Sequence, residues 1–234
     1  MVKFAFGLAL ASMLSLASGS KTRGSRMQTY KASCHGRVRV TNLTFKQDFS
    51  AAIIVAHEKG SRPLFSEGAK ARNAISMLAE EGLSGNVQNI ATRESGFCGF
   101  AAPESKGLIF PGKTWEGKIQ FDANKCKDPV YSVVAKLDNT NDAFMGIAGS
   151  KFPTGSCPSK HFPPAFDAGS ETNNEKCTCM PGRACPEGTR DARERHGRNS
   201  EGFIHVHRGF QGVGDLSKDY GWQNPVAVVV VSKV

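Results

Sequence analysis

The sequence predicts a mainly β protein, an antiparallel β-sandwich of about eight strands with one inserted helix and a disulfide-stapled loop. Three observations support this prediction. Most apolar stretches alternate apolar and polar residues with period two, which is typical of strands with one buried face. One stretch, residues 69–82, has the helical period instead. The segments between these stretches are rich in Gly, Pro, Asn and Asp, which favour turns.

The first expected strand covers residues 37–45, where Val38 and Val40 alternate with Arg37 and Arg39. Such alternation indicates a strand with one wet face. Further strands are expected at 51–57, 114–122, 130–137, 143–147, 203–207 and 225–234. The run at 51–57 is more continuously apolar, so we expect a buried strand there.

The expected helix, 69–82, places four apolar residues on one face: Ala71, Ile75, Leu78 and Ala79. Ser66 offers an N-cap just before it, and Gly82 offers a C-cap at its end.

The N-terminus resembles a secretory signal peptide over residues 1–19, with Lys3 ahead of an apolar run that ends in small residues. Residues 20–34 are basic and lack apolar periodicity, and we expect a flexible leader there. The folded domain is then 35–234. No later apolar run approaches the ~18–20 residues that span a bilayer, so we expect no membrane span and a secreted, extracellular protein. The basic leader could bind acidic polysaccharide or nucleic acid, or be a solubilising tail. It lacks the interleaved aromatic residues typical of nucleic-acid binding, so we expect no nucleic-acid partner.

Seven cysteines in an exported chain predict disulfides. Cys177 and Cys179 are too close in sequence to bond to each other, and we expect them to reach Cys157 and Cys185. These bonds would staple the polar, arginine-rich segment 172–201, a loop insertion that breaks the strand pattern. Cys98 and Cys126 are expected to form a further pair, which leaves Cys34 unpaired.

Asn42, Leu43 and Thr44 form an N-glycosylation acceptor sequence, although it lies within an expected strand. Two acidic turns are more informative. Asp142 follows one expected strand and precedes the next, and Asp167 and Glu171 belong to a second turn. Loops at one end of a sandwich converge, so the two turns can form a solvated surface, a catalytic carboxylate pair or a site for a hard cation such as calcium.

Histidines offer a second candidate site. His205 and His207 alternate in an expected strand, so their rings share one face. With His57, at the end of another strand, they would supply three imidazoles for a transition metal. Ordinary surface or partly buried histidines are the alternative interpretation.

Five blocks of the sequence, in order, resemble the spondin domain family (the spondin N-terminal-type domain). They are RVRVTNLTFKQDFSAAIIVAHE (37–58), NTNDAFMGI (139–147), DAGSETNNE (167–175), HVHRGFQGVGDL (205–216) and WQNPVAVVVV (222–231). The resemblance covers nearly the whole expected domain, apart from the segment 172–201. It implies a β-sandwich related to the synaptotagmin-type calcium-binding sandwich. It also implies a calcium ion held by Asp142, Asp167 and Glu171, with Glu171 standing where animal members have Asp.

The resemblance further implies an extracellular matrix or cell adhesion role. The leading functional hypothesis is a non-enzymatic, calcium-binding module for an extracellular ligand, such as a glycan or a matrix protein. Two alternatives are a secreted metal-dependent hydrolase that uses Asp142, Asp167 and the His205 and His207 face, and a calcium-dependent binder of lipid head groups. The sequence does not indicate an oligomeric state.

Overall fold

The computed structural model describes residues 34–102, 107–191 and 200–233, with side chains from Gly36 onward. The predicted signal peptide, residues 1–19, lies outside this part of the chain. The predicted leader, 20–34, also lies outside it except for the backbone of Cys34, which begins the first strand.

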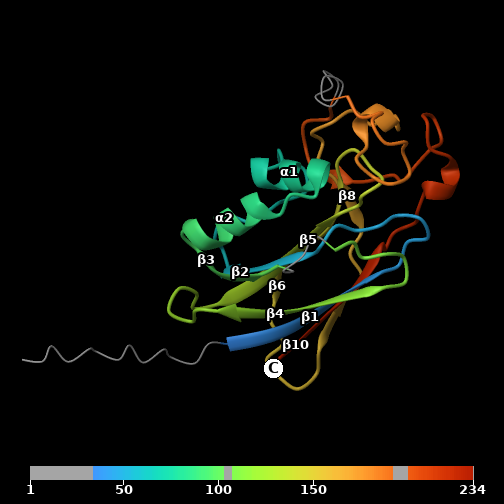
Figure 1. Ribbon diagram of the computed structural model, residues 1–234. Coiled ribbons are helices and arrows are strands. Elements are labelled where there is room, and N and C mark those ends of the chain that lie inside the picture. Colours follow the sequence, from blue (N-terminus) through green and yellow to red (C-terminus); the bar gives the residue numbers. More distant parts are fainter. Residues whose placement is uncertain (1–33, 103–106, 192–199, 234) are drawn as a thin grey trace, which may run out of the picture. The chain divides into compact units, whose positions relative to one another are not determined.

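Two antiparallel sheets build the domain, as the sequence predicts (Figure 1). The four-stranded sheet has the order β4-β1-β10-β7, with β4 Thr114–Phe121, β1 Cys34–Asn42, β10 Ala227–Lys233 and β7 Ser159–His161. The six-stranded sheet has the order β3-β2-β5-β6-β8-β9, with β3 Phe97–Ala101, β2 Ile53–Glu58, β5 Pro129–Lys136, β6 Ala143–Lys151, β8 Ala165–Asp167 and β9 His205–Val206. The prediction missed β3, β7 and β8, which are three to five residues long and too short to show a clear period.

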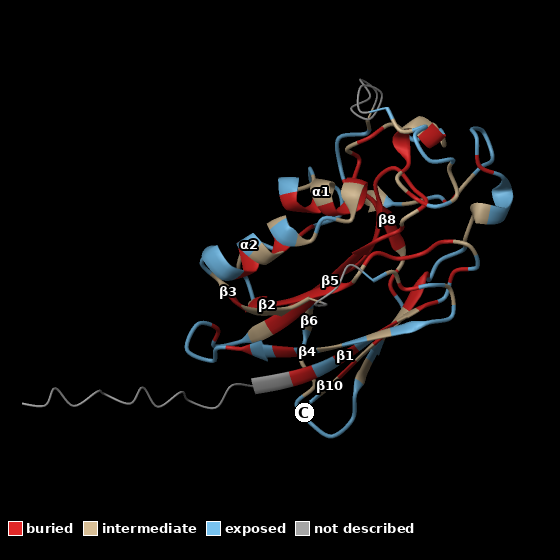
Figure 2. Cartoon of the chain, in the orientation of Figure 1, coloured by how far each residue is buried: buried red, intermediate tan, exposed pale blue. Residues whose placement is uncertain are grey.

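The main core lies between the two sheets (Figure 2). Val38 and Val40 of β1 point into it, while Arg37 and Arg39 are exposed, as the alternation predicts. The six-stranded sheet meets them with apolar side chains such as Val133.

A second apolar layer lies on the other face of the six-stranded sheet, under helices α1 Asn73–Glu81 and α2 Gly85–Arg93. The prediction of one helix at 69–82 is corrected here in two ways. The first helix begins at Asn73 with Arg72 rather than Ser66 at the N-cap, although Gly82 caps its end in the left-handed conformation as expected. The second helix was missed because its face is short and most of its residues are polar.

These helices also explain why β2 lacks alternation, because the strand is buried on both sides. Ile54 belongs to the inter-sheet core, and Ile53 belongs to the layer under the helices. The two α-helices are nine residues each, and among the described residues no helix is long and apolar enough to cross a membrane.

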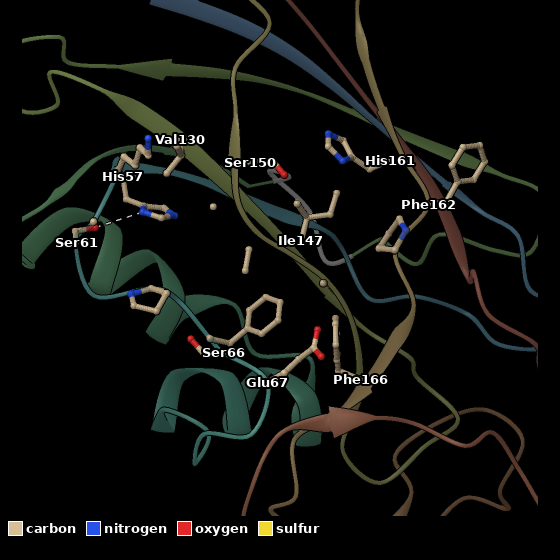
Figure 3. Close-up of a pocket in the computed structure, with 18 residues that line it drawn as sticks. His57, Ser61, Ser66, Glu67, Val130, Ile147, Ser150, His161, Phe162 and Phe166 are labelled. Atoms are coloured by element: carbon tan, nitrogen blue, oxygen red, sulfur yellow. Dashed lines mark hydrogen bonds between the residues drawn. The ribbon is translucent and has the colours of Figure 1, made fainter.

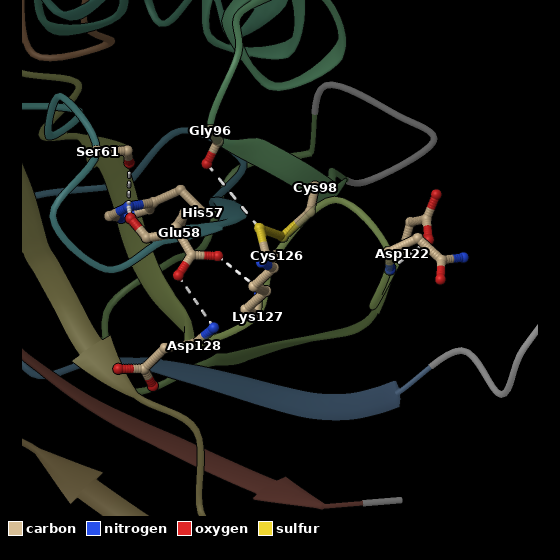
Figure 4. Close-up of a disulfide and its surroundings, with 10 residues drawn as sticks. His57, Glu58, Ser61, Gly96, Cys98, Asp122, Cys126, Lys127 and Asp128 are labelled. Atoms are coloured by element: carbon tan, nitrogen blue, oxygen red, sulfur yellow. Dashed lines mark hydrogen bonds between the residues drawn. A yellow bond between two sulfur atoms is a disulfide. The ribbon is translucent and has the colours of Figure 1, made fainter.

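Two disulfides form among the described residues. Cys98–Cys126 is confirmed and ties β3 to the loop before β5 (Figure 4). Its sequence separation of 28 residues corresponds to a stabilisation of roughly 3–4 kcal/mol in the chain-entropy estimate. Cys177 bonds to Cys185, one of the two partners that the sequence analysis left open for it, and the bond staples the loop insertion.

The expectation that Cys157 also bonds to Cys177 or Cys179 is corrected. Cys157 is an exposed thiol in the loop before β7, whereas Cys179 is buried at the end of the 3-10 helix η1 Cys177–Cys179. The bond would require one of them to leave its position. The side chain of Cys34, predicted to be unpaired, lies outside the described residues.

Within the residues that the structure describes, the loop insertion has a defined fold. Cys177 and Met180 pack with Leu216 in a small apolar cluster, beside the 3-10 helix η2 Lys218–Tyr220. Asn141 Nδ2 donates to the carbonyl of Thr172 at 3.1 Å, which places the start of the loop beside the turn that carries Asp142.

Candidate functional site

The two acidic turns meet because of strand pairing. β6 and β8 are antiparallel neighbours, and Ala143 stands opposite Asp167. The turn before β6 therefore lies beside the turn after β8, and the N–H of Ala168 donates to the carbonyl of Asp142 at 3.1 Å. The structure thus brings Asp142, Asp167 and Glu171 to one end of the sheet, and all three side chains are fully buried.

Asp142 connects the two turns through one of its carboxylate oxygens. Its Oδ2 accepts backbone N–H bonds from Ser170 at 2.7 Å and from Glu171 at 2.9 Å. Its Oδ1 has no hydrogen-bond partner although it is buried.

Asp167 is held by its own turn. The N–H of Gly169 donates to Oδ1 at 2.7 Å, and the amide of Asn173 donates to Oδ2 at 2.6 Å. Gly169 has a φ of 62°, and a Cβ there would lie 2.3 Å from the carbonyl oxygen of Phe203, so only glycine fits this close turn. Asp167 is therefore fixed in place by the local sequence.

Glu171 is the most unusual of the three side chains. Both of its carboxylate oxygens are buried and neither has a hydrogen-bond partner. Buried polar groups in folded proteins are nearly always hydrogen-bonded, because an unpaired one costs about 1–3 kcal/mol and a charged one more. Glu171 therefore calls for a physical explanation.

The electrostatics of the site follow from this burial. Burial raises the pKa of Asp142 to about 7, and the nearby charge of Asp167 adds to the effect. Burial also raises the pKa of Glu171 to about 8, reinforced by the charges of Glu80 and Asp142. The pKa of Asp167 is raised by burial as well. These buried carboxyl groups therefore hold their protons more readily than free ones, and a nearby positive charge would favour their ionised forms. The ligand atoms of the three residues do not all lie within 4.8 Å of one another.

One buried cation already faces this cluster. Lys136 ends β5, is fully buried, and donates from Nζ to the carbonyls of Thr140 at 2.9 Å and Asn141 at 3.0 Å, and to that of Ala79. Burial lowers its pKa to about 8, while the charges of Asp138, Asp142 and Glu171 oppose the shift. Lys136 thus joins helix α1 to the turn that carries Asp142. The sequence analysis missed it because a lysine ending a strand ordinarily points into solvent.

The histidines do not gather as the sequence analysis expects. His205 and His207 line one cavity. His57 lines another, drawn in Figure 3, and the two cavities have no lining residue in common. In its own cavity His57 contacts Ser132 Oγ through Nε2 at 2.9 Å and Ser61 Oγ through Nδ1 at 3.3 Å. The three-imidazole site is therefore corrected, because His57 is the fifth of the six residues of β2 and its ring points toward Ser61 and Ser132.

Asn42 is also corrected as a glycosylation site. Its side chain is fully buried, and its Nδ2 donates to the carbonyls of Gln47 at 2.7 Å and Ile109 at 2.8 Å. A glycan on this nitrogen would have to displace both bonds and enter the protein interior. Asn42 instead closes the loop that follows β1.

A different group of potential metal ligands does form beside Asp167. Asp167, Glu201 and His205 each place one ligand atom within 4.8 Å of the others. The sequence analysis did not include Glu201, and the four-residue spacing between Glu201 and His205 is too common to have indicated a site.

These site assignments depend on the residues of this chain alone, because no protein-family model matches the chain and no curated protein matches its sequence. The resemblance to the spondin domain, and the relation to the synaptotagmin-type sandwich that it implies, remain predictions.

Proposed function

We propose that this protein is a secreted, non-enzymatic binding module of the extracellular matrix or adhesion type. In this proposal Asp142, Asp167 and Glu171 hold a calcium ion that fixes the loops at one end of the sandwich. The observation that supports it most is the set of three buried carboxylate oxygens without hydrogen-bond partners, Asp142 Oδ1 and both oxygens of Glu171.

Charge balance supports a divalent cation. Asp142, Asp167 and Glu171 carry three negative charges when ionised, and Lys136 supplies one positive charge beside them. Glu80 adds a further negative charge beside Glu171 and Arg190 a further positive one, so negative charge remains in excess, and a divalent cation would offset that excess. Calcium accepts six to eight oxygen ligands, so carboxylates from two turns, with carbonyls and water, suit it better than a metal that prefers nitrogen or sulfur.

Burial also favours binding over catalysis at this cluster. A catalytic carboxylate must reach the proton it transfers, within about 2.6–3.2 Å of the substrate. Asp142 and Glu171 are fully buried, so a substrate in solvent would not reach them. A calcium ion there would act on the shape of the two turns, and through them on the surface presented to an extracellular glycan or matrix protein.

The two disulfides agree with the proposed secretion, because disulfides persist mainly in oxidising compartments. They also hold β3 and the loop insertion in place while the acidic turns respond to the cation.

Calcium-dependent thermal stability tests the proposal. With about 1 mM calcium and a dissociation constant of about 0.1 mM, linkage stabilises the folded state by about 1.4 kcal/mol. For a domain of this size the expected rise in melting temperature is about 3–6 °C relative to chelator. Differential scanning fluorimetry of the purified protein measures it.

Two variants and a control locate the site. Asp167→Asn and Glu171→Gln should each abolish the rise, because each removes a charged ligand. Glu171→Gln should also raise the melting temperature in chelator, since the amide has no charge to bury. Glu116→Gln, on the exposed face of β4, should keep the full response. Identical melting curves in calcium and chelator for the parent protein would refute the proposal.

A further inference from the structure

A cavity of about 520 Å³ opens beside Asp167. Asp167, Glu201 and His205 line it, and neither Asp142 nor Glu171 does. Its rim carries large apolar side chains that are exposed, Phe203, Val206 and Val213. The cavity is thus distinct from the calcium cluster, although Asp167 belongs to both.

Strand pairing and a loop contact bring the three residues together. β8 and β9 are antiparallel neighbours, and Asp167 stands directly opposite His205. The N–H of Gly202 donates to the carbonyl of Gly169 at 2.9 Å, which sets Glu201 beside the same turn. One ligand atom of each residue lies within 4.8 Å of the others. Zinc bonds of about 2.0–2.1 Å in a tetrahedron require ligands ~3.3 Å apart, so small side-chain rotations would close the site.

Neighbouring groups orient these ligands in the way that the outer groups of metal sites do. The amide of Asn173 donates to Asp167 Oδ2 at 2.6 Å and to Glu201 Oε1 at 3.0 Å, which holds the two carboxylates together. His207 accepts the N–H of Gly209 at Nδ1 at 2.9 Å, so its proton is assigned to Nε2, which lies 3.8 Å from Asp167 Oδ2.

The hydrogen bonding of His205 leaves the lone pair of its Nε2 available to bind a metal ion. Its Nδ1 lies 3.3 Å from the carbonyl of Val206 and is therefore assigned as the donor. Its Nε2 has no hydrogen-bond partner among the residues that the structure describes. No lysine or arginine in the same part of the chain lies within 4.0 Å of the carboxylate of Asp167 or Glu201, so their charges are not balanced by an ion pair with one.

We propose that Asp167, Glu201 and His205 form a second cation site, for a divalent transition metal of the Zn²⁺ type, with an open coordination position toward the cavity. The imidazole nitrogen decides the class of metal, because calcium and magnesium take oxygen ligands whereas zinc takes nitrogen and carboxylate oxygen. Three protein ligands leave a fourth position for water or for an oxygen of a bound molecule.

Zinc titration by isothermal calorimetry tests this proposal on tag-free protein that has been treated with chelator and dialysed. The parent protein should bind one equivalent of zinc. His205→Ala and Glu201→Gln should each weaken the affinity at least tenfold, since even changes to the outer groups of metal sites cost about 10–100-fold. His161→Ala is the matched control, because His161 lines the separate cavity and contacts Tyr131, and it should change the zinc affinity less than twofold.

The outcomes separate this inference from the proposed calcium site. His205→Ala and Glu201→Gln change residues that are not fully buried, and an unchanged calcium response in the thermal assay would show that they fold. If His205→Ala binds zinc as tightly as the parent, the inference is wrong. It is also wrong if Asp142→Asn loses zinc binding while His205→Ala keeps it, because the zinc would then occupy the calcium cluster. Zinc binding that depends on His205, in a protein without a calcium response, would overturn the proposed function alone.

Discussion

The inter-sheet core and the acidic end of the six-stranded sheet are built on the same strands but with different chemistry. In the middle of β5, Val133 and Ala135 pack against the four-stranded sheet. At the end of that strand the buried side chain is Lys136, and the turn that follows leads to the buried Asp142. The residues buried along this sheet are therefore apolar in its middle and charged at the end where the acidic turns lie.

This difference predicts two kinds of stability within one domain. Apolar burial depends on the area removed from water and changes little with protons or ions. A buried charge depends on its partners, because desolvation must be offset by an opposite charge, a hydrogen bond or a bound cation. The two regions should therefore respond differently to pH, to calcium and to substitution.

Removing the buried ammonium should have the largest effect. In Lys136→Met, three carbonyls lose their donor and the buried carboxylates lose their neighbouring positive charge. Breaking a buried charged network costs about 3–5 kcal/mol, and we expect a loss of that size in the free energy of unfolding at pH 7. Urea denaturation in chelator measures it. Lys118→Met, on the exposed face of β4, is the control and should change the free energy of unfolding by less than about 0.5 kcal/mol. A loss as small as that for Lys136→Met would contradict the difference between the apolar core and the charged end of the sheet.

An apolar truncation in the inter-sheet core should have a smaller effect that is independent of conditions. Val133→Ala removes two buried methyl groups and leaves a small cavity, so we expect a loss of about 2–3 kcal/mol in the free energy of unfolding. The same loss should be measured with calcium and with chelator, and at pH 6.5 and 7.5. A loss that changes by more than about 0.5 kcal/mol between these conditions would show that the two regions are coupled.

The smallest expected effect is the pH dependence of the calcium-free protein. The folded-state pKa of Asp142 is raised to about 7 and that of Glu171 to about 8, whereas both groups ionise near pH 4 in the unfolded chain. The folded state therefore binds more protons, and its stability falls as pH rises toward these folded-state values. Between pH 6.5 and 7.5 the two carboxylates alone give a fall of roughly 2 kcal/mol, and the lowered pKa values of His57, His161, His207 and Lys136 oppose it, so we expect a net fall on the order of 1 kcal/mol.

Denaturation at a series of pH values in chelator checks this slope. Glu171→Gln should flatten it, because the amide does not titrate, and saturating calcium should flatten it in the parent. The pKa of His207 is lowered to about 4 by burial, so it opposes the fall only near pH 6.5, where a histidine of the unfolded chain is still half protonated. A stability that rises with pH across the window would contradict the carboxylate assignments.

Much of the fold follows from local patterns in the sequence. The alternation of β1 and β4, the apolar face of α1 and its glycine cap are each set by neighbours within a few residues. The Cys98–Cys126 pair and the Cys177–Cys185 pair also agree with the sequence analysis. Short strands such as β7 and β8 were missed because three residues carry no period, and they exist only because longer strands offer them hydrogen-bonding edges.

The sequence by itself determined the mainly β class and the positions of the two acidic turns. Only the tertiary structure decided which of these residues meet. It set Asp142 beside Asp167 and Glu171 through the pairing of β6 with β8, kept His57 away from His205, and buried Lys136 and Asn42. The physical reason is that burial and proximity depend on the register of strands far apart in the chain. A residue's type sets the chemistry it can perform, and its packed surroundings set whether it is charged, accessible and partnered.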